Sequence, residues 1–165
     1  MAMDAKKALG AGIAAGLISG LVKLGWENVL PPRTADRDAE NPPYKTMKLL
    51  GVPDKLIHQK YHFSGHEIEW PGFIIHFGFS ASFAALYELL RHKYPAIAKD
   101  HGTLYGIGVW AAFHLGVMPA LNVVPSAKDQ PKDEHVSELL GHMVWMWTND
   151  LVGKKIYAEL TNKKD

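Results

Sequence analysis

A chain of 165 residues fits one domain, and 47% hydrophobic with 21% charged residues would on average suit a soluble protein. The 18 basic and 17 acidic side chains leave a net charge of +1, and no basic stripe with interleaved aromatic residues is present, so we expect no nucleic-acid partner. Because cysteine is absent, disulfides, thiolate metal sites and cysteine nucleophiles are excluded. Any metal site needs histidine or carboxylate ligands.

The charged residues are unevenly distributed along the chain. They gather in segments that alternate with apolar stretches of membrane-crossing length, so the mean hydropathy of -0.10 averages two unlike populations. We predict an all-α fold: one integral membrane domain, residues 1–165, that forms a bundle of four transmembrane helices with a long polar loop between the first two. The predicted spans cover about residues 8–30, 70–90, 102–121 and 135–152.

The first span carries a glycine at every fourth position, namely Gly12, Gly16 and Gly20. This spacing places the glycines on one helix face, and in a bilayer such a face lets another helix approach closely. The neighbour is either a helix of the same chain or a second copy. This face is therefore a candidate contact of a homo-oligomer.

The loop at about 31–68 is polar and rich in proline. We expect two short amphipathic pieces within it, at 44–50 and 54–57, to lie on the membrane surface. The fourth span is the least apolar, which leaves a soluble histidine-rich helical bundle as an alternative fold. Lysine and arginine are densest in the short flanks on the side of the termini, so we expect both termini in the cytoplasm.

Every predicted span also contains ionisable residues, which cost roughly 2.5–3.5 kcal/mol each at a helix centre and normally face the bundle interior. Consecutive helices alternate in direction, so depth is measured from the side of the loops at 31–68 and 122–134. One ionisable group from each span lies about seven residues, or roughly 10 Å, below that side. These groups are Lys23, His76, His114 and His142, with Glu27 and Glu138 one turn nearer the surface.

A spacing of four, three and four residues in the fourth span predicts a polar stripe that turns inward, formed by Glu138, His142, Trp145 and Asn149. One interpretation is that the buried polar groups only pair with one another and specify the packing of the bundle. Three histidines and a carboxylate on one level make a working site an equally good interpretation.

Three chemistries fit this set of residues. Histidine titrates near neutrality and responds to neighbouring charges, so the set suits the binding of protons without a cofactor. Alternatively, zinc or another divalent metal would take ligands from His76, His114, His142 and Glu138. No HExxH motif supports a metal site, and Lys23 at the same level would repel a dication. The third chemistry is the binding of a small anion at Lys23.

Polar residues nearer the two surfaces have weaker interpretations. His66, Glu67 and Glu69 precede the second span and are either solvated loop residues or a candidate entrance to the buried set. Glu88 and Asp150 lie toward the side of the termini, where we expect them to reach the headgroups, cap helix ends or mark a proton exit.

Four segments have a distinctive sequence: VKLGWE at 22–27, LPPR at 30–33, PPY at 42–44 and VSELLGHMVWMW at 136–147. Together with His66, His76 and His114, they resemble the YagU-like family of bacterial inner-membrane proteins, whose function is unknown. The resemblance extends over all four predicted spans. It implies a multi-pass protein of the bacterial cytoplasmic membrane with a four-helix fold, and it implies no established reaction.

These observations leave three functional hypotheses. The first is a membrane protein without enzymatic activity that binds or moves protons or a small ion in a pH-responsive way. The second is an intramembrane metal-dependent hydrolase with a three-histidine site, and the third is a structural or assembly protein. The common depth of the ionisable groups favours a pocket reached from one side over a continuous polar path across the membrane.

Overall fold

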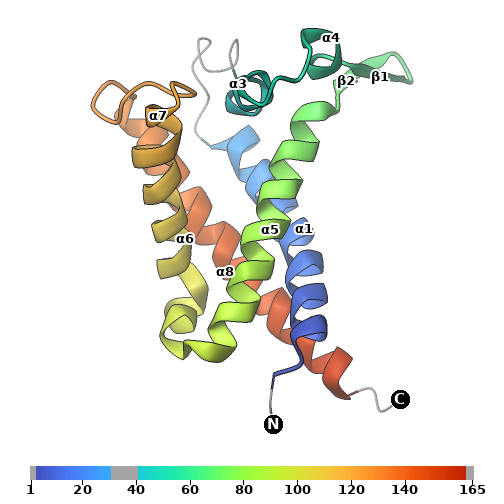
Figure 1. Ribbon diagram of the computed structural model, residues 1–165, viewed down its shortest axis with the longest axis vertical. Coiled ribbons are helices and arrows are strands. Elements are labelled where there is room, and N and C mark those ends of the chain that lie inside the picture. Colours follow the sequence, from blue (N-terminus) through green and yellow to red (C-terminus); the bar gives the residue numbers. More distant parts are fainter. Residues whose placement is uncertain (1–2, 31–40, 163–165) are drawn as a thin grey trace.

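The computed structural model describes residues 3–30 and 41–162, and most of them are helical (Figure 1). The long helices are α1 (Ala5–Val29), α5 (Pro71–Lys93) and α8 (Lys132–Asn162). A further long helical stretch joins four segments, η1 (Pro95–Gly102), α6 (Thr103–Trp110), η2 (Ala111–Val117) and α7 (Met118–Ala120). The long elements run alternately up and down, so both termini lie at one end of the bundle and the elements at 42–69 lie at the other.

Within the described residues, three helical stretches are long and apolar enough to cross a membrane: Ala5–Val29, Pro71–Lys93 and Pro95–Ala120. Many large apolar side chains on these helices are exposed, for example Leu21 and Ile74, which is the surface that lipid tails cover. The predicted helical membrane fold is confirmed. The count of four spans is not, because charged residues such as Glu138 and Lys154 interrupt the apolar sequence of α8.

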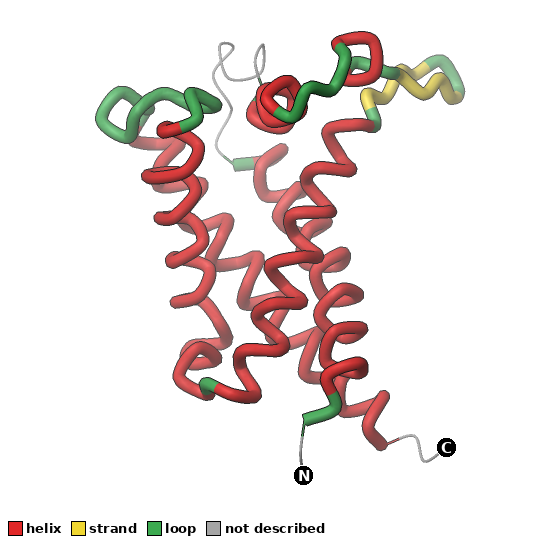
Figure 2. The backbone as a smooth tube through the Cα atoms, viewed as in Figure 1, coloured by secondary structure: helices red, strands yellow, loops and turns green. Residues whose placement is uncertain are grey.

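The prediction of an all-α fold is wrong in one segment, because β1 (Lys60–Phe63) and β2 (His66–Glu69) form an antiparallel hairpin (Figure 2). Ser64 and Gly65 make its turn with φ angles of 49° and 78°, as a tight two-residue hairpin requires. The two amphipathic pieces predicted nearby form the helices α3 (Pro42–Leu49) and α4 (Asp54–Ile57). Residues 31–40 of the predicted long loop lie outside the described residues.

The glycine face of α1 packs against α5. A Cβ atom at Gly12 would lie 2.6 Å from the Ala85 Cα, and one at Gly16 would lie 2.7 Å from the Ala81 Cα, so neither position accepts a larger residue without a shift of the helices. Of the two neighbours considered for this face, the structure shows the helix of the same chain. Within one chain α5 therefore covers this face, and a contact with a second copy stays a prediction.

The apolar core lies toward the middle of the bundle. Its buried residues are Tyr87, Val109, Trp145 and Met146, and the side chains packed around them include Phe79, Phe83 and Phe113. Trp145 thus connects the core to the inward face of α8. The predicted polar stripe on that face is confirmed, because Glu138, His142, Trp145 and Asn149 are all buried.

Candidate functional site

A cavity of about 290 Å³ lies between the long helices, near the end of the bundle that carries α3. Its walls are mostly apolar and include Ile75, Phe79, Phe113, Val117 and Met118, and residues of α3 also line it. All six ionisable residues predicted to form a buried set line this cavity: Lys23, Glu27, His76, His114, Glu138 and His142. A mostly apolar pocket with a few convergent polar groups is typical of a binding site.

Glu138 on α8 is the centre of the polar part of the cavity. Its Oε2 atom lies 3.4 Å from Lys23 Nζ on α1, and Lys23 also pairs with Glu27 one helical turn further along. The Lys23 and Glu138 side chains are mostly buried, so little solvent screens their attraction. This ion pair connects the first and last helices of the bundle.

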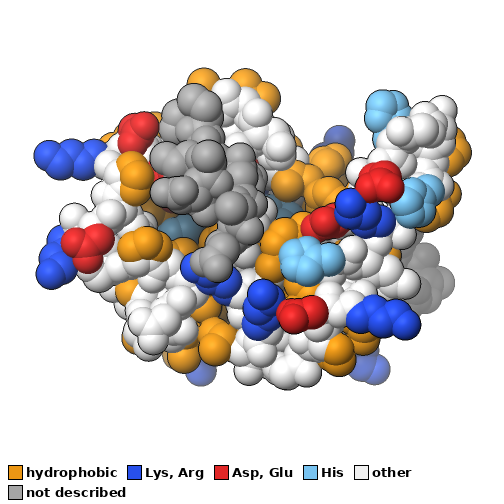
Figure 3. Space-filling model, turned by 90° about the horizontal axis from the view of Figure 1, so that it is seen from above, with side chains coloured by type: hydrophobic (Ala, Val, Ile, Leu, Met, Phe, Trp, Pro, Cys, Tyr) orange, Lys and Arg blue, Asp and Glu red, His pale blue; other side chains and the backbone are white. Residues whose placement is uncertain are grey.

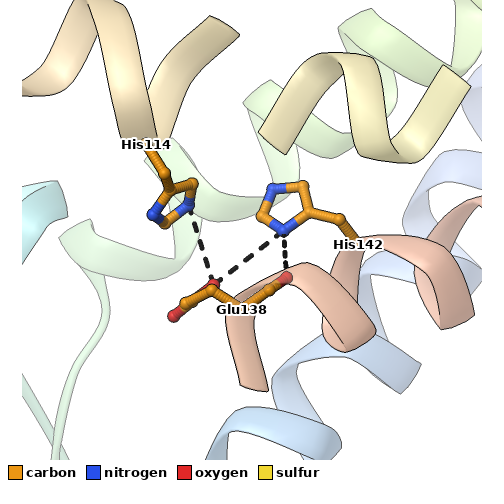
Figure 4. Close-up of side chains that lie close together, drawn as sticks. All are labelled: His114, Glu138 and His142. Atoms are coloured by element: carbon orange, nitrogen blue, oxygen red, sulfur yellow. Dashed lines mark hydrogen bonds and ion pairs between the residues drawn. The ribbon is translucent and has the colours of Figure 1, made fainter. Parts of the chain in front are cut away.

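Two histidines approach the same carboxylate oxygen (Figure 4). His114 Nε2 lies 3.7 Å and His142 Nδ1 lies 3.9 Å from Glu138 Oε2, and the two rings meet edge to face at 5.1 Å between centroids. His142 Nδ1 donates a hydrogen bond of 2.7 Å to the Glu138 backbone carbonyl, which leaves the lone pair of a neutral ring on Nε2. We call Glu138, His114 and His142 the Glu138 cluster.

The local backbone of the third span helps to place His114. This residue lies in η2, where the helix widens into π-helical turns, a feature that often marks functional sites. One segment earlier, Gly106 lies against α8 so closely that a Cβ atom would collide with the His142 carbonyl oxygen. His114 thus reaches the Glu138 carboxylate from a widened stretch of helix that follows the close contact between α6 and α8.

His76 lines the cavity but stands apart from the Glu138 cluster. Its Nε2 atom lies 2.8 Å from the Gly20 carbonyl oxygen, so this nitrogen is engaged by the backbone of α1. Among the described residues, the group whose donor atoms come within 4.8 Å of one another contains His114, Glu138 and His142. His76, the third histidine of the predicted metal set, is not in this group of described residues.

Ser80 and Trp145 are the last residues along α5 and α8 that line the cavity. Trp145 Nε1 donates a hydrogen bond of 2.7 Å to Ser80 Oγ, and Ser80 donates one of 2.7 Å to the Gly16 carbonyl. Ser80 was not predicted as a site residue. Its position one helical turn after His76 was the signal in the sequence that could have identified it.

The candidate entrance residues lie on the hairpin strand β2, and none of His66, Glu67 and Glu69 is among the described residues that line the cavity. Seen from this end, charged and histidine side chains are spread over the surface (Figure 3). The Lys60 ammonium, 2.7 Å from Glu67 Oε2, holds the pKa of that carboxyl below its usual value. Burial, together with the neighbouring Glu69, raises the pKa of Tyr44 to about 12.

The expectation that Glu88 and Asp150 reach the headgroups is wrong, because both are fully buried. Each is paired within the bundle. Arg91 donates a hydrogen bond of 2.7 Å to Glu88, and Lys154 donates one of 2.6 Å to Asp150. Burial of these carboxylates is possible because cationic partners compensate their charge.

Three apolar helical stretches of membrane-crossing length, and a cavity among the helices that holds ionisable residues, define a multi-pass integral membrane protein. A family model described as "Protein of unknown function (DUF1440)" matches residues 17–151. The chain is also 30% identical over 177 residues to the inner membrane protein YagU of Escherichia coli (strain K12), in an alignment that covers 93% of this chain and 86% of the relative. The chain therefore belongs to this YagU-like family, which confirms the resemblance seen in the sequence. No solved structure matches it.

Proposed function

We propose that this protein resides in the bacterial inner membrane and binds protons at the Glu138 cluster, which they reach from the side of α3. The observation that carries the proposal is the meeting of one carboxylate with two imidazoles, 3.7 Å and 3.9 Å away, at the wall of a cavity. Polar groups that only hold helices together need no such space around them.

The geometry also suits a response of the bundle to protonation. Lys23 and the two histidines approach the same oxygen of Glu138, so a charge gained by a histidine competes with Lys23 for one carboxylate. Groups that interact this strongly titrate as a unit. Proton uptake by the Glu138 cluster is thereby coupled to the contact between α1 and α8, which gives the site a pH-responsive character.

The proposal includes a fourth membrane crossing by α8. A helix of 31 residues is about 46 Å long, which exceeds the roughly 30 Å of the hydrocarbon layer. Its buried charged residues, including Glu138 and Asp150, form ion pairs with other residues of the bundle, so they need not face the lipid. With four crossings both termini lie on one side, and the positive flanks favour the cytoplasm.

Potentiometric titration of purified protein from pH 8 to pH 5 tests proton binding at the Glu138 cluster. We expect the double variant His114→Asn/His142→Asn to take up about one proton per chain fewer than the wild type, because the two imidazoles share one carboxylate. The hairpin pair His62→Asn/His66→Asn, which removes two exposed histidines outside the cavity, is the matched control. If the double variant does not fold, His114→Asn alone should lose about one proton.

Unchanged proton uptake in folded histidine variants contradicts the proposal. Loss of thermal stability in that case, without any change in uptake, would assign the Glu138 cluster a purely structural role, as in the third hypothesis from the sequence.

The donor set of the Glu138 cluster favours a second candidate, a metal-dependent hydrolase. Two imidazoles and a carboxylate with donor atoms within 4.8 Å match the protein ligands of several catalytic zinc sites, whose donors lie roughly 3.4 Å apart. Elemental analysis of protein purified without chelators decides this candidate. About one zinc per chain, lost in Glu138→Gln, supports it, and less than about a tenth of a metal ion per chain excludes it.

A further inference from the structure

A second group of buried charged residues lies toward the end of the bundle that carries the termini. Asp150 accepts hydrogen bonds of 2.6 Å from both the Tyr87 hydroxyl and Lys154 Nζ, and His101 Nδ1 lies 3.3 Å from its Oδ2 atom. We call Asp150, Glu88 and these partners the Asp150 cluster. The side chains of His101 and Lys154 are 52% and 44% exposed, so this cluster extends to the protein surface near the termini.

Asn149 lies between the cavity and the Asp150 cluster. On α8 it follows Trp145, the last residue of this helix that lines the cavity, by one helical turn, and it precedes Gly153 by one turn. A Cβ atom at Gly153 would lie 2.9 Å from Glu88 Oε2, so this face of α8 is directed at the second group of charges. Residues one turn apart share a helix face, which places Asn149 in the gap between the two polar regions.

Among the described residues, the Asn149 side chain has no hydrogen-bond partner. It is fully buried, and within the part of the chain that the structure describes, neither its amide nitrogen nor its amide oxygen makes a hydrogen bond. Buried amides in native proteins are almost always satisfied, and those without a protein partner usually bind ordered water.

We propose that water bound at Asn149 connects the cavity to the Asp150 cluster and that the protein transfers protons across the membrane by this route. The inference rests on the proposed function, because the Glu138 cluster supplies the entry. A proton from one side reaches the cavity, passes through the water at Asn149 to the Asp150 carboxylate and leaves through the exposed His101. Each group returns to its initial state, so the net change is one proton moved.

The route extends what the sequence indicated. The common depth of the predicted buried set favoured a pocket open to one side only, and the structure does place that pocket beside α3. Asn149 belongs to the same inward stripe of α8 but lies about 16 Å further along the helix than Glu138. Its unpaired amide is the observation that connects the pocket to the charges near the termini.

Proteoliposomes that contain a pH-sensitive dye test this route, with potassium and valinomycin present to compensate the transferred charge. Under an imposed pH gradient, we expect wild-type protein to dissipate the gradient and Asn149→Leu to slow the flux at least tenfold, because leucine cannot bind water. Asn149→Ser, which keeps a polar group, should remain within about threefold of the wild type. Asn162→Leu, at the exposed end of the same helix, is the matched control and should conduct normally.

Two results overturn the inference: wild-type liposomes that conduct no faster than protein-free liposomes, or Asn149→Leu with wild-type flux. If the leucine variant does not fold, Asn149→Val takes its place and is judged in the same way. Titration of the same preparations separates the two proposals. Normal proton uptake without flux contradicts only the transfer route, whereas absence of the uptake assigned to the Glu138 cluster contradicts the proposed function as well.

Discussion

At the scale of single residues, Gly106 determines how closely the third span approaches α8. Any Cβ atom at this position collides with the His142 carbonyl, whereas Gly108 in the same helix has open space around its Cα. Gly106→Ala should therefore destabilise the protein by about 1–3 kcal/mol, the usual cost of overpacking. The control Gly108→Ala should be neutral or slightly stabilising, because alanine favours helix more than glycine.

Thermal unfolding in detergent measures the difference between the two glycine variants. We expect Gly106→Ala to lower the unfolding midpoint by several degrees relative to Gly108→Ala. Equal midpoints for the two variants would show that the close contact between α6 and α8 is not present in solution.

Tyr87 stabilises a buried charge at the opposite end of the bundle. Its hydroxyl donates a hydrogen bond of 2.6 Å to Asp150, and neither residue is exposed. Tyr87→Phe removes one donor from a buried carboxylate, which should cost about 1.5–3 kcal/mol of stability. Tyr94→Phe, which alters an exposed phenol, should cost nothing measurable. Chemical denaturation measures the free energy of unfolding of both variants. Equal values would mean that the Tyr87 hydroxyl does not stabilise the buried Asp150 carboxylate.

At the scale of secondary-structure elements, the hairpin has two unlike faces. Tyr61 lies opposite Ile68 in the β1–β2 register, and Phe63 lies opposite His66 on the same face. His62 and Glu67 lie opposite each other on the other face. The three apolar side chains are exposed, and Trp70 follows directly at the start of α5. An aromatic face beside the end of a membrane helix suits the headgroup layer, so we expect this face to lie in the bilayer surface.

Spin labels test the orientation of the hairpin, and the absence of native cysteine permits single-site labelling. Oxygen concentrates in the membrane, so a nitroxide at Phe63→Cys should be more accessible to oxygen than a nitroxide at the matched site His62→Cys. The nitroxide at His62→Cys should be the more accessible of the two to a water-soluble nickel complex. Identical accessibilities at the two sites would contradict a surface-bound hairpin.

The sequence predicted the long elements well because their signals are local. The spacing of Gly12, Gly16 and Gly20 revealed a close helix contact, and the inward stripe of α8 followed from its periodicity. The hairpin was missed because Lys60 to Phe63 is a short alternating run with polar neighbours, although Ser64-Gly65 is a turn signal. The wide turns of η2 were not predicted, because the apolar run at 111–117 looks in sequence like the rest of an ordinary membrane helix.

The site was predicted to a similar degree. Depth along each helix placed six ionisable residues near one level, and all six line one cavity. Depth says nothing about rotation around the helix axis, so it could not distinguish His76, which bonds to Gly20, from His114, which meets Glu138. The complete burial of Asp150 depends on Tyr87 and His101 from distant segments, and such contacts are not visible in a local pattern.

At the scale of the whole molecule, four crossings would place both termini on one side of the membrane and α3 on the other (Figure 1). Single cysteines at the exposed positions Lys6, Lys155 and Lys128 report this arrangement through a membrane-impermeant maleimide. We expect the reagent to label Lys128→Cys in intact spheroplasts and to label the other two only after permeabilisation. Labelling of Lys6→Cys and Lys155→Cys from opposite sides would show that α8 does not cross.

The central claim is that the Glu138 cluster exchanges protons in the folded, membrane-embedded protein. Nitrogen NMR of histidine-labelled protein in lipid bilayers measures the protonation of each ring directly between pH 8 and pH 5. We expect the signal of at least one of the two rings, His114 or His142, to change from neutral to charged within this range, because both rings approach the Glu138 carboxylate, and we expect Glu138→Gln to shift that transition. Signals from His114 and His142 that stay constant over the whole range would contradict the central claim.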